Sequence, residues 1–531
     1  MERRKEIVQK CFVIFLFVAY LLMGCFVYRD YGISTDEPNE RESTFVNLKY
    51  VLDTFGIDAL DGADGDLENY PDRNYGVVIQ VLPTLVECIM GFPGSPTIYY
   101  IRHLWTFLIC FTGYVCFYLM CREVFKSRWL SLLGTAMLAL YPRFFAEQFY
   151  NIKDMVFAAM VMVSMFLTVR VIESKCSVFW TIAFGIIAAL TTNVRMIGAI
   201  FPILLLGYLW LSGILKKHKV QVEDNCNHIF RTSFLIIIVF LMSYIVMLPA
   251  LWKNPISGIV DVFTEFSNYH WNGTIVFMGK IIGVDELPWY YIPIWLSISL
   301  PIWYIILGAL IIGGVIFVLI RKIRKKQSVH LLSIVFHYKY ILWAALIGFL
   351  PWLATVVMHS AIYNGWRHFY FVLPPIVFVI VGGINYIFTK FSKNQFLKKG
   401  IILISVIGLS IQSGWIVINH PYEMVYLNAV GRIWGSDFDR DYWGLACVEL
   451  SRYILEHDDS EKISLETSND ILMRFLPENE KERIELTEDA KYYIETYRGK
   501  IGNDVILEDY DEYYSITVDG YRIATIFKKK D

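Results

Sequence analysis

Residues 12–40 of the chain read FVIFLFVAYLLMGCFVYRDYGISTDEPNE and combine a membrane-spanning pattern with a pair of acids. An apolar run from Phe12 to Val27 is followed, after a short polar step, by two adjacent carboxylates, Asp36 and Glu37. Pro38 has no backbone N–H to donate and disfavours helical geometry at the residue before it, so the sequence predicts an extended or turned segment just outside a membrane span. Acids held there suit a general base or a metal ligand. If the segment is extended, the side chains of Asp36 and Glu37 should point in roughly opposite directions. The alternative is a solvated loop whose acids have no function.

The composition of the whole chain is that of a polytopic membrane protein. Of its 531 residues, 56% are hydrophobic, 16% are aromatic and only 18% are charged. This is too apolar for a soluble protein of that length. The apolar residues gather in runs close to the roughly twenty residues that a helix needs to cross a bilayer. The net charge of −2 gives no indication of a nucleic-acid partner.

The apolar runs predict about eleven membrane-spanning helices. The first run has no small-x-small cleavage site, so we expect it to be retained as a span. The expected fold class is an all-α polytopic membrane protein of about eleven transmembrane helices with a small C-terminal α/β extracytoplasmic domain. The predicted spans are residues 11–28, 98–120, 129–142, 154–172, 178–193, 196–215, 231–250, 291–320, 340–359, 369–389 and 400–418.

The distribution of Lys and Arg predicts the orientation of these spans. Every second connection is basic, as cytoplasmic loops are, beginning with the segment before the first span. An odd number of spans then puts the N-terminus in the cytoplasm and the C-terminus outside. We therefore expect a multi-pass protein of the plasma membrane, divided into a transmembrane domain, residues 1–419, and an extracytoplasmic domain, residues 420–531. Its long outer loops would be residues 29–97 and 251–290.

Secondary structure outside the spans is predicted at three places. Residues 77–90 are apolar but few and contain Pro83, which indicates an interfacial or re-entrant helix. Residues 443–457 look helical. Residues 513–518 and 521–527 alternate as strands do around Asp519-Gly520, which predicts a β-hairpin with a tight turn.

Unusual ionisable residues gather on the predicted outer side. Alone, an Arg at a span end reaches to lipid headgroups, and a His beside a Trp is usually packed. Together they place a base beside an anion-binding cluster, which is what an enzyme needs when a lipid-borne phosphate is the leaving group. The acids are Asp36, Glu37 and Asp154, and the cations are Arg143, Lys153, Arg195 and Arg367, with His270 and His368 beside them.

Two functions without catalysis stay open at this point. One is a lipid or sugar flippase or transporter whose outer charges form a vestibule. A transporter would be expected to carry ionisable residues in mid-span or helices broken by Gly and Pro, and the mid-span regions here are nearly free of charge. The other is a membrane scaffold that presents the C-terminal domain.

Short motifs, in their order along the chain, resemble the bacterial members of glycosyltransferase family 39. These are relatives of protein O-mannosyltransferases and aminoarabinose transferases within the GT-C class, and the resemblance covers nearly the whole chain. No segment after the spans could hold the additional sugar-binding-like repeats of the eukaryotic O-mannosyltransferases, which leaves the acceptor open. The motifs are Asp36-Glu37, Pro142-Arg143-Phe144, Asn151-Ile152-Lys153-Asp154, Pro288-Trp289-Tyr290-Tyr291, Gly365-Trp366-Arg367-His368 with Pro374-Pro375, His420-Pro421-Tyr422-Glu423 and Asp441-Tyr442-Trp443-Gly444.

The resemblance implies a membrane glycosyltransferase. It would move a hexosyl, mannosyl or pentosyl group from a polyprenyl-phosphate donor to an extracytoplasmic hydroxyl of a glycan, lipid or protein, with inversion. Asp36 would deprotonate that hydroxyl, and since a phosphate leaves without needing a proton, one base suffices. The implied residues are Asp36, Glu37 and Asp154 for catalysis, Arg143, Lys153, Arg195 and Arg367 for the donor phosphate, and His270, His368, Trp289 and Tyr290 for substrate contact.

We expect no obligatory metal, because fixed cations suffice to neutralise the phosphate. A divalent cation held by Asp36, Glu37 and Asp154 is the alternative. The expected partners are membrane lipid, the lipid-linked sugar donor and the acceptor, with no nucleic acid. Neither the sugar nor the acceptor follows from the sequence.

Overall fold

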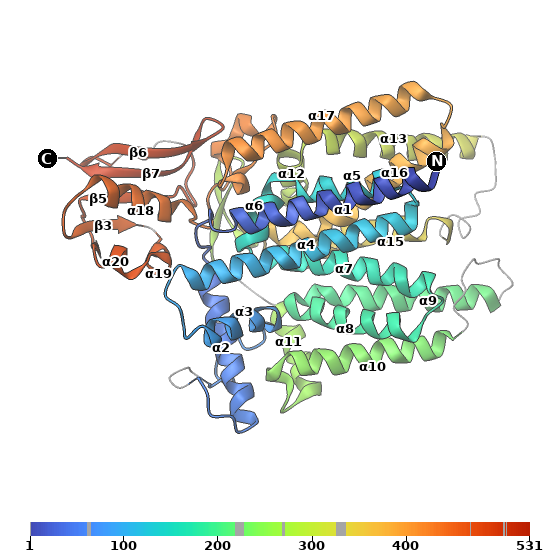
Figure 1. Cartoon of the computed structure of the whole chain (residues 1–531), viewed down its shortest axis with the longest axis horizontal. Helices are drawn as coiled ribbons and strands as arrows, with labels where there is room; N and C mark the ends of the chain where they lie inside the picture. Colours follow the sequence, from blue (N-terminus) through green and yellow to red (C-terminus); the bar gives the residue numbers. More distant parts are fainter. Residues whose placement is uncertain are drawn as a thin grey trace.

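The structure is a computed structural model that describes residues 2–60, 65–217, 228–267, 271–324, 336–467, 469–502, 505 and 507–530. Long helices run side by side in a bundle, and a small domain of strands and short helices lies at one end of it (Figure 1). The expected fold class, a helical membrane protein with a small C-terminal α/β domain, is confirmed.

Eight helices in the described part of the chain are long and apolar enough to cross a membrane, or up to ten spans if each of two bent helix pairs counts as one. The prediction of about eleven spans also included α8 (Val178–Val194), which has only 17 residues. The eight long helices are α1 (Glu2–Val27), α4 (Thr97–Phe125), α7 (Asp154–Glu173), α9 (Ile200–Lys217) with the preceding turn η1 (Met196–Ala199), α10 (Ile229–Met247), α15 (Lys339–Met358), α16 (Leu373–Lys390) with the preceding turn η4 (Arg367–Val372), and α17 (Gln395–Asn419).

The predicted spans 129–142 and 291–320 are not straight. The first consists of α5 (Arg128–Ala139) and α6 (Pro142–Tyr150), bent by 65°, and the second of α12 (Tyr291–Ser299) and α13 (Ile302–Arg324), bent by 118°. A proline stands at each break, Pro142 and Pro301. Because proline cannot donate the backbone hydrogen bond that continues a helix, the chain changes direction there. The first bend turns α6 into the interior of the bundle.

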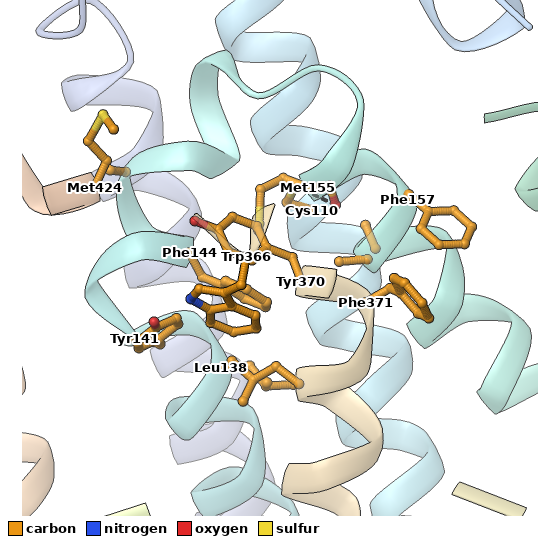
Figure 2. Packing of buried hydrophobic residues seen from close by; sticks show 14 of the residues in the cluster. Cys110, Leu138, Tyr141, Phe144, Met155, Phe157, Trp366, Tyr370, Phe371 and Met424 are labelled. Atoms are coloured by element: carbon orange, nitrogen blue, oxygen red, sulfur yellow. Dashed lines mark hydrogen bonds between the residues drawn. The ribbon is translucent and has the colours of Figure 1, made fainter. Parts of the chain in front are cut away.

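The core of the bundle is built around α6 and α7. All nine residues of α6 are buried. In the apolar 18-residue stretch of α7 that could cross a membrane, 89% of the residues are buried. Figure 2 shows aromatic side chains from α6 and η4 meeting there, with ring centroids of Phe144 and Tyr370 at 5.3 Å and of Trp366 and Tyr370 at 4.8 Å. These contacts hold η4, which begins at Arg367, against α6.

The first predicted outer segment, residues 29–97, is more helical than expected. It contains α2 (Glu37–Thr54) and α3 (Val78–Ile89), and α3 agrees with the short helix predicted there. The predicted extended or turned segment is a turn at Thr35 and Asp36, and a helix begins directly after it: Asp36 is the N-cap of α2, with φ −83° and ψ −23°. Pro38 does not prevent the helix, because the backbone N–H groups of a first helical turn need no partner within the helix.

The second predicted outer segment, residues 251–290, is hydrogen-bonded to the C-terminal domain. It begins in η2 (Pro249–Leu251) and contains α11 (Pro255–Ser267) and a hairpin of β1 (Thr274–Phe277) and β2 (Lys280–Gly283). The Val276 N–H donates to Asp439 Oδ1 at 3.1 Å, and the Gly279 N–H donates to the Asp437 carbonyl at 3.0 Å. The hairpin is thereby bonded to the beginning of the C-terminal domain.

The C-terminal domain contains a five-stranded sheet in the order β4-β3-β5-β7-β6, with α18 (Ala446–His457) packed beside it. The predicted hairpin is confirmed as β6 and β7, which pair antiparallel across Asp519-Gly520. The strands are β3 (Ile463–Thr467), β4 (Ile484–Leu486), β5 (Tyr492–Glu495), β6 (Tyr510–Val518) and β7 (Tyr521–Lys529), and the short helices are α19 (Leu472–Phe475) and α20 (Glu478–Lys481).

Candidate active site

Three charged residues from distant parts of the chain meet where α2, α7 and η4 begin. The Nη1 group of Arg367 donates to Asp36 Oδ2 at 2.9 Å and to Asp154 Oδ2 at 3.1 Å. Arg195, which follows α8, donates to the other oxygen of Asp154. The carboxylate of Asp154 therefore binds two guanidinium groups, those of Arg195 and Arg367. The guanidinium of Arg367 in turn binds two carboxylates, those of Asp36 and Asp154.

The two carboxylates differ in accessibility. The side chain of Asp36 is 32% exposed, whereas that of Asp154 is 1% exposed and held by two cations. A base has to reach its substrate, and Asp36 satisfies that requirement. Asp154 instead holds Arg195 and Arg367 in place.

A cavity of about 440 Å³ opens beside this cluster. Lys153 lies on its wall, with its ammonium 2.6 Å from Glu40 Oε1 and 3.9 Å from the ring centroid of Tyr75. The guanidinium of Arg367 lies over the ring of Tyr363 at 5.1 Å. The residues predicted for the site that line this cavity are Asp36, Lys153, Arg195, Arg367 and His368.

Local hydrogen bonds explain why these groups converge. The side chain of Asn151 accepts from the Asp154 N–H at 2.8 Å and so satisfies a free donor at the start of α7. The hydroxyl of Ser34 donates to the Tyr150 carbonyl at 3.0 Å. The segment before α2 is thereby attached to the end of α6, and Asp36 reaches the beginning of α7.

Glu37 faces the protein and not the cavity. Its carboxylate is fully buried, accepts from the Ser34 N–H at 2.8 Å and the Ser34 hydroxyl at 3.1 Å, and lies 3.0 Å from Nε2 of His103. Asp36 and Glu37 therefore point apart, as the sequence predicted. The reason is different: the two residues lie at the start of a helix, where successive side chains diverge by about 100°.

Three other predicted site residues lie away from the cavity. Arg143 follows the bend at Pro142 into the interior, where its Nε donates to the Tyr426 carbonyl at 3.0 Å and its guanidinium lies 5.4 Å from the ring centroid of Trp295. Trp289 is 63% exposed and lines a separate cavity of about 230 Å³. Tyr290 packs against Phe277 in β1, at 6.2 Å between ring centroids. His270 lies outside the described residues.

Sequence reasoning missed several residues that hold the cluster together. Glu147 and Asn151 are hydrogen-bonded to each other at 2.7 Å. Their spacing of four residues, which puts two side chains on one face of a helix, was the available signal. Trp443, quoted above only as part of a motif, stacks on Arg367 with 4.5 Å from the guanidinium to the ring centroid. Glu40 pairs with Lys153.

The acids considered for a divalent cation do not converge on one point. Arg367 stands between Asp36 and Asp154, and Glu37 is turned toward Ser34 and His103. Across the described ranges, no group of three or more His, Cys, Asp or Glu side chains is arranged to hold a metal ion. The residues present therefore do not fit the metal alternative.

Residues 91–251 match the model of a protein family described as dolichyl-phosphate-mannose-protein mannosyltransferase. The matched part begins just before α4, ends at η2 and contains Lys153, Asp154 and Arg195. Together with the apolar helices, this match indicates the class: residues 91–251 of this multi-pass chain are similar to a family of membrane mannosyltransferases. The resemblance seen in the motifs is confirmed over this range, which contains Pro142-Arg143-Phe144 and Asn151-Ile152-Lys153-Asp154. No curated protein is significantly similar to the chain.

Solved structures that resemble the chain at low sequence identity include an archaeal oligosaccharyltransferase and ArnT. The oligosaccharyltransferase AglB from Archaeoglobus fulgidus, in complex with an inhibitory peptide and a dolichol-phosphate, is 10% identical over 89% of this chain and 64% of its own length, with a TM-score of 0.48. ArnT from Cupriavidus metallidurans, bound to undecaprenyl phosphate, is 12% identical over 97% of each chain, with a TM-score of 0.45. The present chain thus spans less than two thirds of the archaeal enzyme.

Proposed function

We propose that the protein transfers a sugar from a polyprenyl-phosphate donor to a hydroxyl acceptor outside the membrane, with inversion at the anomeric carbon. The observation that carries this proposal is the contact of Asp36, an accessible carboxylate, with Arg367 beside a cavity that Lys153 and Arg195 also line. A base next to several cations suits a reaction that takes one proton and releases one phosphate. The match to a family described by a dolichyl-phosphate-linked sugar supports the same class of donor.

In this mechanism Asp36 removes the proton of the acceptor hydroxyl. The acceptor oxygen attacks the anomeric carbon from the face opposite the phosphate, and a new glycosidic bond forms as the bond to the phosphate oxygen breaks. The bonding electron pair leaves with the polyprenyl phosphate. Since this leaving group needs no proton, no second carboxylate has to act as an acid.

The cations of the cavity receive the departing charge. Lys153, Arg195 and Arg367 line the cavity. An anionic phosphate oxygen bound there is a fitting acceptor for their charged N–H groups, because hydrogen bonds between ionised partners are the strong ones. His368 lies on the same wall and is available for contact with the sugar or the phosphate.

The proposed orientation puts the active site and residues 420–531 outside the membrane and the N-terminus in the cytoplasm. The basic N-terminal segment lies at the opposite end of the bundle from the C-terminal domain (Figure 1). Positive residues concentrate on the cytoplasmic side of membrane proteins, which supports this assignment. The acceptor would then be a glycan, lipid or protein hydroxyl at the outer surface.

The experiment that tests the function uses purified full-length protein in liposomes with a labelled polyprenyl-phosphate sugar and mixed acceptors. We expect release of polyprenyl phosphate together with a glycosylated acceptor, and loss of both in Asp36→Asn. Movement of the intact donor across the bilayer without cleavage would instead identify a flippase. Mass spectrometry of surface glycans, lipids and proteins from a deletion strain would then identify the sugar and the acceptor.

A further inference from the structure

A buried carboxylate outside the cavity, that of Glu147 in α6, accepts hydrogen bonds from four side chains. Asn151 donates to Oε2 at 2.7 Å and Trp443 Nε1 to the same oxygen at 3.3 Å, while the hydroxyl of Tyr442 donates to Oε1 at 3.3 Å, and that of Tyr370 also donates there. The donors come from the end of α6, from η4 and from the C-terminal domain. Glu147 thus joins three parts of the chain that are far apart in sequence.

Glu147 is connected to both sides of the Asp154–Arg367 ion pair. On one side, Asn151 uses its amide N–H₂ for Glu147 and its oxygen for the Asp154 N–H, which orients the start of α7. On the other side, Tyr370, which donates to Glu147, belongs to the same turn as Arg367. A displacement of Glu147 would therefore move both partners of the pair.

Trp443 makes a second, direct contact with this pair. Its ring lies 4.5 Å from the guanidinium carbon of Arg367, while its indole N–H is directed at Glu147. The side chain is fully buried. A Trp ring over a desolvated guanidinium is a favourable cation–π contact, and the indole bond to Glu147 restricts where the ring can lie.

The turn that presents Trp443 is held by Asp441. Its Oδ1 accepts from the Gly444 N–H at 2.9 Å and its Oδ2 from the Ala446 N–H at 2.9 Å. Gly444 has φ +75°, a left-handed conformation that glycine adopts without steric cost. The Asp441–Gly444 turn is thus a rigid element of the C-terminal domain aimed at the interior of the bundle.

We propose that Glu147 and Trp443 are positioning residues that hold the Asp154–Arg367 pair in its catalytic geometry, so that the Asp441–Gly444 turn of the C-terminal domain is part of the catalytic centre. This inference rests on the proposed function. All four partners of Glu147 are donors, and a carboxylate is a group that only accepts. A glutamine of nearly equal size would turn an N–H₂ group either toward the Asn151 and Trp443 donors or toward two tyrosine hydroxyls, which would then have to accept instead of donate.

The test compares two variants with matched controls in the full-length reconstituted protein. Glu147→Gln and Trp443→Phe remove the carboxylate and the indole N–H. Glu495→Gln is the control for the first, because Glu495 is another buried carboxylate that accepts from Tyr493 and Lys500, away from the cluster. Trp415→Phe is the control for the second, because Trp415 donates its indole N–H to Asp519 at 3.1 Å. Each control loses the same kind of bond without touching Arg367 or Asp154.

We expect kcat to fall by about tenfold to a hundredfold in Glu147→Gln and Trp443→Phe, which corresponds to the loss of a hydrogen bond to a charged group, with the KM for the donor changed much less. The two control variants should lose about as much Tm as Glu147→Gln and Trp443→Phe do. Their kcat should nevertheless stay within about twofold of that of the unchanged protein. A double-mutant cycle of Trp443→Phe with Arg367→Lys, measured on kcat, should be non-additive, because the two side chains are in contact and Trp443 is proposed to act through Arg367.

The inference and the proposed function fail in distinguishable ways. If Glu147→Gln and Trp443→Phe resemble their controls while Asp36→Asn is inactive, the positioning role is wrong and the transferase mechanism stands. If Asp36→Asn is also active, the proposed mechanism is wrong. Should Glu147→Gln not fold, the cycle of Trp443 with Arg367 decides, and additivity there overturns the inference.

Discussion

The guanidinium of Arg367 lies 2.9 Å from the carboxylate of Asp36, although 331 residues separate them along the chain. The proposed base is therefore already ion-paired before any substrate binds. The same Arg367 nitrogen also contacts Asp154, so that the direction of the Asp36 side chain is set by a partner that is itself held. This arrangement leads to three predictions, and the pairing of His420 with Glu423 and Asp30 leads to a fourth.

Replacing Asp36 by Asn should abolish the reaction without abolishing donor binding. The change keeps size and hydrogen-bonding capacity but removes the basic oxygen, and a positioned base is typically worth on the order of 10²–10⁴ in rate. Turnover and donor affinity measured on the same preparation check this. Glu37→Gln serves as the comparison, since Glu37 faces His103 and should affect stability more than turnover. Near-normal turnover in Asp36→Asn would contradict the mechanism.

Replacing Arg195 by Ala should weaken donor binding and turnover together, because a contact to the phosphate acts before and during bond cleavage. Loss of one such stabilising contact typically lowers the rate by on the order of 10²–10³. Arg143→Ala, in contrast, should mainly lower the Tm, because Arg143 donates to the Tyr426 carbonyl and does not line the cavity. Donor titration and thermal unfolding of both variants measure the difference. If Arg143→Ala selectively lost donor affinity, Arg143 would have to contact the donor phosphate, and this prediction would be wrong.

Replacing Asp154 by Asn should destabilise the fold more than Asp36→Asn does. Asp154 is buried and neutralises Arg195 and Arg367, and removing one partner of a buried ion pair typically costs about 3–5 kcal/mol. Asp36 is partly exposed, so its loss is largely compensated by water. Thermal unfolding in detergent compares the two variants. Equal Tm values for Asp154→Asn and Asp36→Asn would show that the ion pairs of buried Asp154 stabilise the fold no more than the partly exposed pair of Asp36 does.

Stability should fall as the pH rises from about 6.5 to about 9 because of His420. Burial lowers the pKa of this imidazole, but the hydrogen bond to Glu423 and the charges of Glu423 and Asp30 outweigh burial and raise the pKa to about 9. A group whose pKa is higher in the folded state contributes stability below its unfolded pKa and loses that contribution as the pH rises through the folded one. His420→Gln should flatten the dependence of Tm on pH in this window, and an unchanged slope would refute the assignment.

The sequence alone predicts a polytopic membrane protein and the positions of most of its long helices. Apolar runs near twenty residues report a local property, the cost of transferring each side chain into lipid, and this is why the α7 and α17 regions were predicted correctly. The Asp519-Gly520 turn likewise depends on adjacent residues. The divergence of Asp36 and Glu37 was also predicted, although from strand geometry and not from the helix that begins there.

Which of the charged side chains lie in contact with one another follows only from the tertiary structure. The bend at Pro142 carries Arg143 into the core and away from the cavity, a displacement that depends on how α6 packs and not on the neighbouring sequence. The bonds of Glu147 to Asn151 and Trp443 join positions up to 296 residues apart. Such contacts are made by the folded chain as a whole, because burial forces each polar group to find a partner wherever packing brings one within reach.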